Sequence, residues 1–171
     1  MILLRIKQAN FYKIVLLCYN NPPKKGDFIM IEFKLLEKEH IYEAEKLRYQ
    51  AFGIFEEPND TFYQKRLESG QELGFLLYDD GKLRAGCYIS YFMETIQIDY
   101  VFVDLAYQHT SKKYGYQILQ KVLNSKDLIE EYFGEDIKKY SLEYTSEGSK
   151  KLYEKAGFKE IGSMGKMYRS F

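Results

Sequence analysis

The chain has few of the residues that build covalent or metal-based sites. Of its 171 residues, two are cysteine, two are histidine and none is tryptophan. Cys18 and Cys87 lie far apart and in no CxxC or Cys/His pattern, which argues against a disulfide framework and a cysteine-based zinc site. We therefore expect reduced thiols in a cytoplasmic protein, with a single buried disulfide as the open alternative. His40 and His109 alone do not supply a multi-histidine metal centre, so no metal is expected.

An excess of either charge is lacking as well, because 25 lysines and arginines balance 25 aspartates and glutamates. Zero net charge gives no overall field toward nucleic acid or an anionic membrane, and neither partner is expected. Long hydrophobic runs are also missing. Arg5, Lys7 and Lys13 interrupt the apolar N-terminal segment before it reaches the roughly 18–20 residues of a membrane span. The remaining composition, with 46% hydrophobic residues, suits one globular domain with a substantial core.

Residues 1–29 stand apart from the rest of the chain. They begin like a poor signal peptide, but no small-residue cleavage site follows the apolar stretch. The codons of residues 25–27 can read AAA-GGA-GAT, which contains a bacterial ribosome-binding sequence at a normal distance from Met30. We hypothesise that translation starts at Met30 and that residues 30–171 form a single domain. The alternative is that residues 1–29 add a strand or a tail.

From residue 30 onward, hydrophobic periodicity predicts an ordered series of strands and helices. An Asp-Gly turn within 79–82 joins two strands into a clear hairpin. Strands are predicted at 31–36, 74–78, 83–92, 95–104, 140–144 and, as a final short pair, within 158–171. Helices are predicted at 39–52, 62–67, 114–123 and 147–156, with a further helical turn at 126–133. This order predicts an α/β (α+β) fold with a mixed, mostly antiparallel central sheet and helices on both faces.

The segment from Val101 to Leu123 carries the first functional signal. It is predicted as an apolar strand, then a polar loop containing Lys112, Lys113 and Gly115, then an amphipathic helix. Backbone N–H groups at the start of that helix, together with two cations, suit a bound phosphate. The alternative is a solvated basic loop without a ligand.

The C-terminal segment LYEKAGF, residues 152–158, is followed by a short strand that ends in an aromatic residue. It resembles a signature of the Gcn5-related N-acetyltransferase (GNAT) family. Residues 99–104, DYVFVD, resemble the fourth strand of that family, and residues 107–108 with 112–115 resemble its pyrophosphate loop. The resemblance covers Ile31 to the C-terminus. It implies an acyl-CoA N-acyltransferase-like fold and acetyl-CoA as the cofactor.

In that family two neighbouring parallel strands splay apart, and the pantetheine arm of the cofactor pairs with strand backbone between them, like an added strand. The diphosphate then binds N–H groups of the loop and of the first helical turn. The cofactor-binding residues that the resemblance implies are Val101, Phe102, Val103, Gln108, Ser111, Lys112, Lys113, Tyr114, Gly115, Tyr116 and Ser146.

The resemblance also implies the catalytic residues. Tyr153 would lie near the thioester sulfur, where a phenol can protonate the departing thiolate; the alternative is an aromatic packed on an amphipathic helix. Glu143 is the preferred carboxylate for removing the proton of the acceptor amine, with Asp99 second. The period of two places Asp99 on the same face of its strand as Val103. Solvent-facing strand carboxylates, a water chain in place of a base, and His109 are the alternatives.

The loop departs from the family pattern, which is approximately Q/R-x-x-G-x-G/A. Gln108 and Gly115 fit, but about two residues are inserted, Lys113 stands where the first glycine belongs, and Leu105 replaces a common proline. Glycine permits a positive φ, which lysine resists while offering a charge.

Two functions therefore follow from the sequence. The first is acetyl transfer from acetyl-CoA to a primary amine of a small molecule or peptide. The second is a catalytically weakened module of the same fold that binds CoA or a protein partner. The acidic and aromatic segment 52–67 would border the acceptor cleft, and a homodimer is compatible with both functions.

Overall fold

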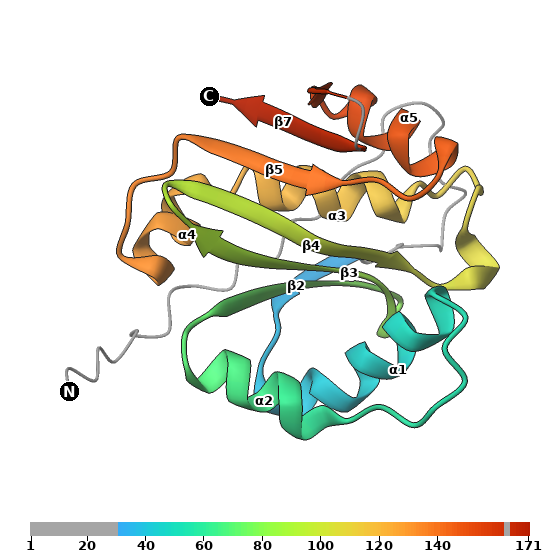
Figure 1. The fold of residues 1–171 in the computed structure, drawn as a ribbon. Helices are drawn as coiled ribbons and strands as arrows, with labels where there is room; N and C mark the ends of the chain where they lie inside the picture. The colour runs from blue at the N-terminus through green and yellow to red at the C-terminus, as the bar shows by residue number, and fades with distance from the viewer. Residues whose placement is uncertain (1–30, 163–164) are drawn as a thin grey trace, which may run out of the picture.

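The computed structural model of this protein describes residues 31–162 and 165–171. The predictions about residues 1–29, the start at Met30 and Cys18 lie outside the described residues. Figure 1 shows one sheet with helices packed against it. The strands are β1 (Ile31–Leu35), β2 (Glu72–Asp79), β3 (Lys82–Phe92), β4 (Thr95–Val103), β5 (Lys139–Glu143), β6 (Lys159–Glu160) and β7 (Lys166–Ser170). The helices are α1 (Ile41–Ala51), α2 (Asp60–Glu68), α3 (Tyr114–Leu123), α4 (Lys126–Phe133) and α5 (Glu147–Lys155), with two 3-10 turns, Lys38–His40 and Leu105–Tyr107.

The seven strands form one mixed sheet in the order β1-β2-β3-β4-β5-β7-β6. The pair β4 and β5 is parallel, and the other pairs among the described strands are antiparallel. This confirms the predicted mixed, mostly antiparallel sheet. The strands β4 and β5 can be parallel because the chain crosses from β4 through α3 and α4 before it returns as β5 (Figure 1). This pair lies at the centre of the sheet.

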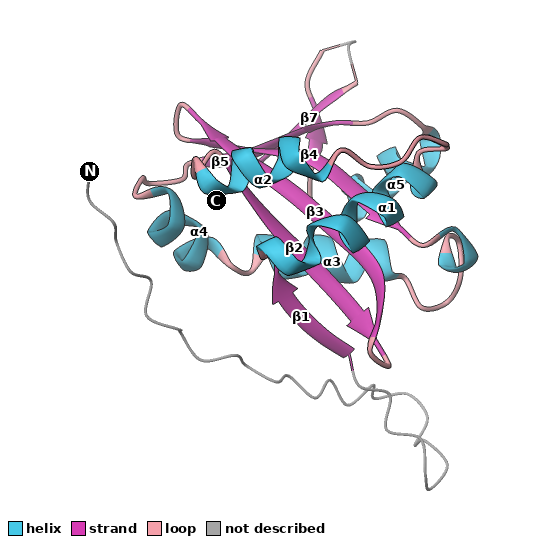
Figure 2. Cartoon of the chain, turned by 90° about the horizontal axis from the view of Figure 1, so that it is seen from below, coloured by secondary structure: helices cyan, strands magenta, loops and turns pink. Residues whose placement is uncertain are grey.

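The helices cover both faces of the sheet, as Figure 2 shows from below, and each face has its own core. On one face, α3, α4 and α5 pack on a large cluster that includes Phe75, Ile118 and Leu142. On the other face, α1 and α2 cover a smaller cluster that includes Tyr63 and Tyr88. Alternate residues of a strand point to opposite faces, so the strands contribute to both clusters.

Most predicted elements appear within one or two residues of their predicted bounds, and the helix at 114–123 appears with the bounds predicted for it. The helical turn expected at 126–133 is a full helix, α4, which Gly134 ends in a left-handed conformation. The helix expected from residue 39 begins at Ile41 because a separate 3-10 turn precedes it. None of the helices in the described ranges is long and apolar enough to span a membrane.

Helix α1 buries charged residues that the apolar periodicity did not reveal. Glu45 and Arg48, three positions apart, are both buried and form an ion pair with an Nη2–Oε2 distance of 2.8 Å. The Arg48 guanidinium also lies over the rings of Tyr63 and Tyr100, at 4.9 and 4.7 Å from their centroids. A buried arginine needs such partners, since an unpaired buried charge is strongly destabilising.

Candidate active site

The strands β4 and β5 separate at the centre of the sheet. Their parallel pairing runs from Thr95 opposite Lys139 to Ile98 opposite Leu142 and stops there. Beyond that point β4 continues to Val103, still paired with β3, while β5 continues alongside β7. The second half of β4 therefore has an edge with no partner strand, in the position where the sequence predicts a splay.

The open edge of β4 presents the backbone of Val101 and Val103. The Asp104 N–H donates a hydrogen bond to the Arg84 carbonyl at 2.9 Å, on the β3 side. Because backbone groups alternate along a strand, those of Val103 and Val101 point away from β3, toward the split. The Val103 carbonyl accepts a 3.2 Å hydrogen bond from the Gln108 side-chain amide. Val101 and Val103 thus have the orientation that a paired pantetheine arm requires.

Phe102, between those two valines, turns its side chain to the opposite face of the sheet. Its ring is 1% exposed and packs edge-on against Tyr88 with centroids 5.2 Å apart. The ring covers Gly86, where an added Cβ would lie 2.2 Å from the Phe102 Cζ. The backbone N–H and C=O of Phe102 point toward Gly86 of β3, so neither its side chain nor its backbone polar groups are available to a ligand in the split.

The loop after β4 is fastened to the β2–β3 hairpin at two places. Arg84 and Asp104 form an ion pair with an Nη1–Oδ2 distance of 2.7 Å. Asp79 accepts hydrogen bonds from the Tyr114 hydroxyl and from Lys112 Nζ, the latter at 3.3 Å. Burial and this carboxylate raise the pKa of Tyr114, so its hydroxyl remains a donor at neutral pH. The Tyr114 side chain is committed to the core, and the charge of Lys112 is partly neutralised by Asp79.

Lys113 has the left-handed conformation that the family pattern assigns to a glycine. Its φ and ψ are 53° and 39°, and it immediately precedes α3. The side chain is exposed and forms no ion pair with another described residue. The conformation costs a non-glycine residue roughly 1–2 kcal/mol, yet it lets the loop turn into the helix as a glycine would. His109, one of the inserted residues, also has a positive φ, of 60°.

Free backbone donors gather where this loop meets α3. The N–H groups of Ser111, Lys112, Tyr114 and Gly115 have no hydrogen-bond acceptor among the described residues. Gly115 lets α3 approach β4 closely, because an added Cβ would lie 3.2 Å from a methyl group of Val103. These N–H groups, the helix N-terminus and the Lys113 cation form a cradle suited to a diphosphate.

Helix α5 closes the site on the side of α3. It starts with a capping box in which Ser146 and Ser149 each accept a hydrogen bond from the other's backbone N–H. Its Leu152 lies near Gly115, and Lys155 Nζ lies 4.7 Å from the centroid of the Tyr116 ring. A Cβ added at Gly148 would lie 3.8 Å from both the Ser146 Oγ and the His109 ring, so the start of α5 lies beside the loop, and Tyr116 follows the cradle residue Gly115.

Tyr153 projects from α5 into the core beneath the split. The side chain is 7% exposed and contacts Phe158, with ring centroids 6.2 Å apart. Its hydroxyl forms no hydrogen bond with another described residue and, unlike the hydroxyl of Tyr140, is not wholly buried. Burial raises the pKa of this phenol, with a smaller contribution from Cys87. Tyr153 is therefore protonated at neutral pH, as a proton donor must be.

The expectation that Asp99 shares the face of Val103 is wrong, because β4 contains a β-bulge. Tyr88 pairs with Tyr100 and Ile89 with Ile98, which leaves Asp99 as the extra residue. Asp99 consequently lies on the α1–α2 face, near Ser90 and Arg66. Burial raises the pKa of its carboxyl group, while Ser90 and Arg66 act in the opposite direction.

Glu143 is the last residue of β5 and lies on the far side of the split. It is exposed and forms an ion pair with Lys166 of β7 at 3.4 Å. The alternation along β5 sets it on the same face as Ser141, whose hydroxyl donates to Gln97 of β4 at 2.5 Å. The structure thus brings Asp99 and Glu143 to one face, on either side of the split, while Tyr153 approaches from the other.

Glu72 is a titratable group that the sequence analysis did not single out. This residue of β2 is 1% exposed, and Arg66 Nε lies 2.8 Å from its Oε2 without the alignment of a hydrogen bond. Burial raises the pKa of Glu72 to about 7, despite the opposing effect of Arg66. The strand was predicted to begin at residue 74, two residues later than β2 begins, so Glu72 was not expected to be buried.

Neither a family model nor a curated protein sequence matches this chain significantly. Solved structures do match. An N-acetyltransferase from Staphylococcus aureus Mu50 has a TM-score of 0.62 at 15% identity, over 82% of this chain and 98% of that one. The spermidine/spermine N-acetyltransferase SpeG from Vibrio cholerae, solved in mutant forms, has a TM-score of 0.60 at 17% identity, over 82% and 94% of the two chains.

The PaiA N-acetyltransferase from Thermoplasma acidophilum, in complex with coenzyme A, has a TM-score of 0.56 at 18% identity, over 82% of this chain and 99% of that one. The chain therefore has the fold of the GNAT N-acetyltransferases, as its sequence predicted. At these identities the likeness establishes the fold alone.

Proposed function

We propose that this protein transfers an acetyl group from acetyl-CoA to a primary amine of a small molecule or peptide by direct attack. The observation that carries the proposal is the split after Ile98 and Leu142, which ends beside the free N–H groups before α3. A parallel sheet that opens onto a helix N-terminus can hold an extended pantetheine arm and a diphosphate in one continuous site.

The catalytic roles follow from the positions around the split. Tyr153 donates a proton to the sulfur of CoA as the thioester carbon–sulfur bond breaks. A backbone N–H at the open edge of β4 holds the carbonyl oxygen, on which negative charge develops. The amine enters from the α1–α2 face, where Glu143 is the preferred carboxylate for removing its proton and Asp99 is the second candidate.

Thermal unfolding with acetyl-CoA tests the proposal. A ligand at about 100 times its dissociation constant stabilises the native state by about 2.7 kcal/mol, which raises the Tm of a chain of this size by roughly 5–10 °C. ATP is the matched control, because it brings phosphates and adenine but no pantetheine arm. An equal shift with ATP, or none with millimolar acetyl-CoA, would contradict an acyl-CoA site.

The second candidate function is a CoA-binding module with weakened catalysis. It is favoured by Lys113, whose left-handed conformation makes the loop more costly than a glycine loop. A panel of primary amines, assayed for release of free CoA thiol, separates the two functions. Stabilisation by acetyl-CoA without turnover of any amine would favour the module.

A further inference from the structure

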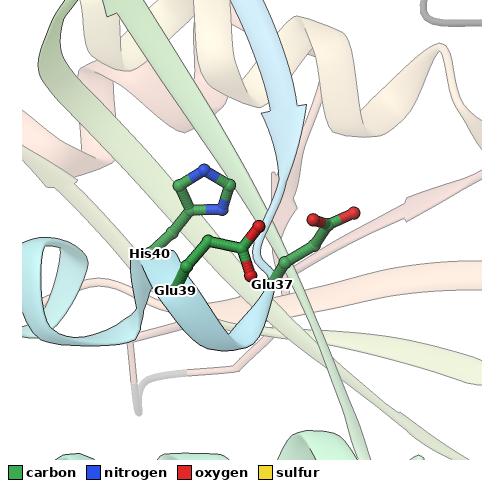
Figure 3. Close-up of side chains that lie close together, drawn as sticks. All are labelled: Glu37, Glu39 and His40. Carbon is green, nitrogen blue, oxygen red and sulfur yellow. The ribbon is translucent and has the colours of Figure 1, made fainter.

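The turn that leads into α1 brings three potential metal ligands together. Glu37 precedes the 3-10 turn Lys38–His40, and the carboxylates of Glu37 and Glu39 and the imidazole of His40 have ligand atoms within 4.8 Å of one another. Figure 3 shows the Glu39 carboxylate between the His40 ring and Glu37. This cluster is separate from the split between β4 and β5.

The backbone fixes where these side chains start. The His40 N–H donates to the Glu37 carbonyl at 2.9 Å and closes the turn. Glu37 is the extended residue before the turn, with φ and ψ of −113° and 167°. The His40 ring is held from the other side by Tyr78 of β2, with ring centroids 6.3 Å apart. The imidazole is thereby positioned before any ligand binds.

A nitrogen of that imidazole lacks the partner its burial calls for. His40 Nδ1 is buried and has no hydrogen-bond partner among the described residues. Buried polar atoms are nearly always paired, and one without a partner calls for an explanation such as an ion. The two carboxylates beside it form no ion pair with another described residue.

We propose that His40, Glu37 and Glu39 bind one divalent transition-metal ion of the zinc class. One imidazole and two carboxylates are a ligand set that Zn²⁺ accepts, with water completing the tetrahedron. The imidazole favours such an ion over Mg²⁺ and Ca²⁺, which prefer oxygen ligands. Zn–N and Zn–O bonds of about 2.0–2.2 Å require the ligand atoms to close to roughly 3.5 Å of one another. Glu37 and Glu39 are exposed and free to make that movement.

The test is a titration of the full, chelator-treated chain with ZnCl₂, followed by calorimetry and thermal unfolding. We expect one equivalent to bind, with a rise in Tm, and at least tenfold weaker binding of MgCl₂. The variant Glu37→Gln/Glu39→Gln changes only exposed side chains and should fold normally while losing roughly 10- to 100-fold in zinc affinity. His40→Gln should lose as much.

Two matched variants control for unspecific binding. Glu56→Gln/Glu57→Gln removes two other exposed carboxylates, and His109→Gln removes the other histidine of the chain; both should keep the affinity of the parent. Zinc binding that survives Glu37→Gln/Glu39→Gln would overturn the proposal. So would a parent chain whose dissociation constant exceeds roughly 100 µM, or one that binds Mg²⁺ as tightly as Zn²⁺.

Discussion

The adjacent residues Lys112 and Lys113 differ in their contacts and in their exposure to solvent. Lys112 pairs with Asp79, whereas Lys113 is exposed in a left-handed conformation at the mouth of the cradle. We expect Lys113→Gly to keep that conformation and to weaken acetyl-CoA binding about 5- to 10-fold, because it removes an exposed cation beside the proposed diphosphate site. Isothermal titration measures the change. Lys112→Ala is the control and should alter affinity by less; tighter binding by Lys113→Gly would show that the lysine only strains the loop.

Tyr153 combines burial with a hydroxyl that has no partner among the described residues. We expect Tyr153→Phe to reduce kcat about 100-fold, since general acid catalysis contributes on the order of 10²–10⁴ in rate. The dissociation constant of acetyl-CoA should stay unchanged. Tyr140→Phe is a suitable control, because Tyr140 is also a core tyrosine with an unpaired hydroxyl, on β5. Unchanged turnover in Tyr153→Phe would show that Tyr153 only packs in the core and takes no part in catalysis.

The raised pKa of Glu72 makes stability depend on pH. In the unfolded chain the pKa of this carboxyl group lies near its ordinary value of 4.5, and in the folded protein it lies near 7. Between these values the native state binds more protons than the unfolded state, so stability falls as pH rises. We expect a loss of roughly 2–3 kcal/mol between about pH 4.5 and 8 from this group.

Urea unfolding at several pH values measures that loss. Glu72→Gln should flatten the decline, because a neutral amide cannot titrate. Glu68→Gln, an exposed carboxylate on α2, should leave the slope as it is. An identical pH slope in the parent and in Glu72→Gln would mean that Arg66 keeps Glu72 ionised throughout.

At the scale of the element, the close packing of β3 and β4 depends on Gly86. The Phe102 ring occupies the space that a side chain would need. We expect Gly86→Ala to destabilise the protein by about 1–3 kcal/mol through overpacking, as urea unfolding would show. A further Phe102→Leu change should recover part of that loss, since the two positions are in contact. Gly148→Ala, where the nearest atoms lie 3.8 Å away, should cost little; an equal loss there would remove the steric explanation.

Most elements were predictable because strands and helices bury one face at a regular spacing, as in α3 and the β2–β3 hairpin. The β-bulge at Asp99 was not predicted, although the sequence of β4 contains a sign of it. Ile96 and Ile98 are apolar at even positions, and Val101 and Val103 at odd ones, which one inserted residue explains. The burial of Glu45, Arg48 and Glu72 was not predictable from spacing, because it depends on partners brought together by the tertiary fold.

For the whole molecule, the order of elements was predictable because the hairpin and the crossover through α3 and α4 leave few arrangements of the sheet. The contacts that join distant segments were not. The ion pair of Lys112 with Asp79 links residues 33 positions apart, and neither position indicates the other. The place where β4 and β5 separate was therefore predictable, whereas the electrostatics of the loop before α3 were not.

We also propose that translation of the natural protein starts at Met30. Mass spectrometry of the protein from its native source should find an N-terminal peptide that begins at Met30 or Ile31. A peptide from residues 1–29 would refute the proposal and leave an added strand or tail as the interpretation of that segment.

The bulge at Asp99 gives β4 two halves of opposite parity. Before it, even-numbered residues face α3; after it, odd-numbered residues do. Deleting Asp99 would remove the bulge and leave the later residues on their present faces, whereas deleting Val101 would send the Phe102 ring toward α3 and the Val103 side chain toward α1. Substitutions along β4 change one contact each, whereas deletion of one residue beyond the bulge would exchange the two faces of the strand where it borders the proposed cofactor site. This half of β4 should thus tolerate changes of side chain far better than changes of length.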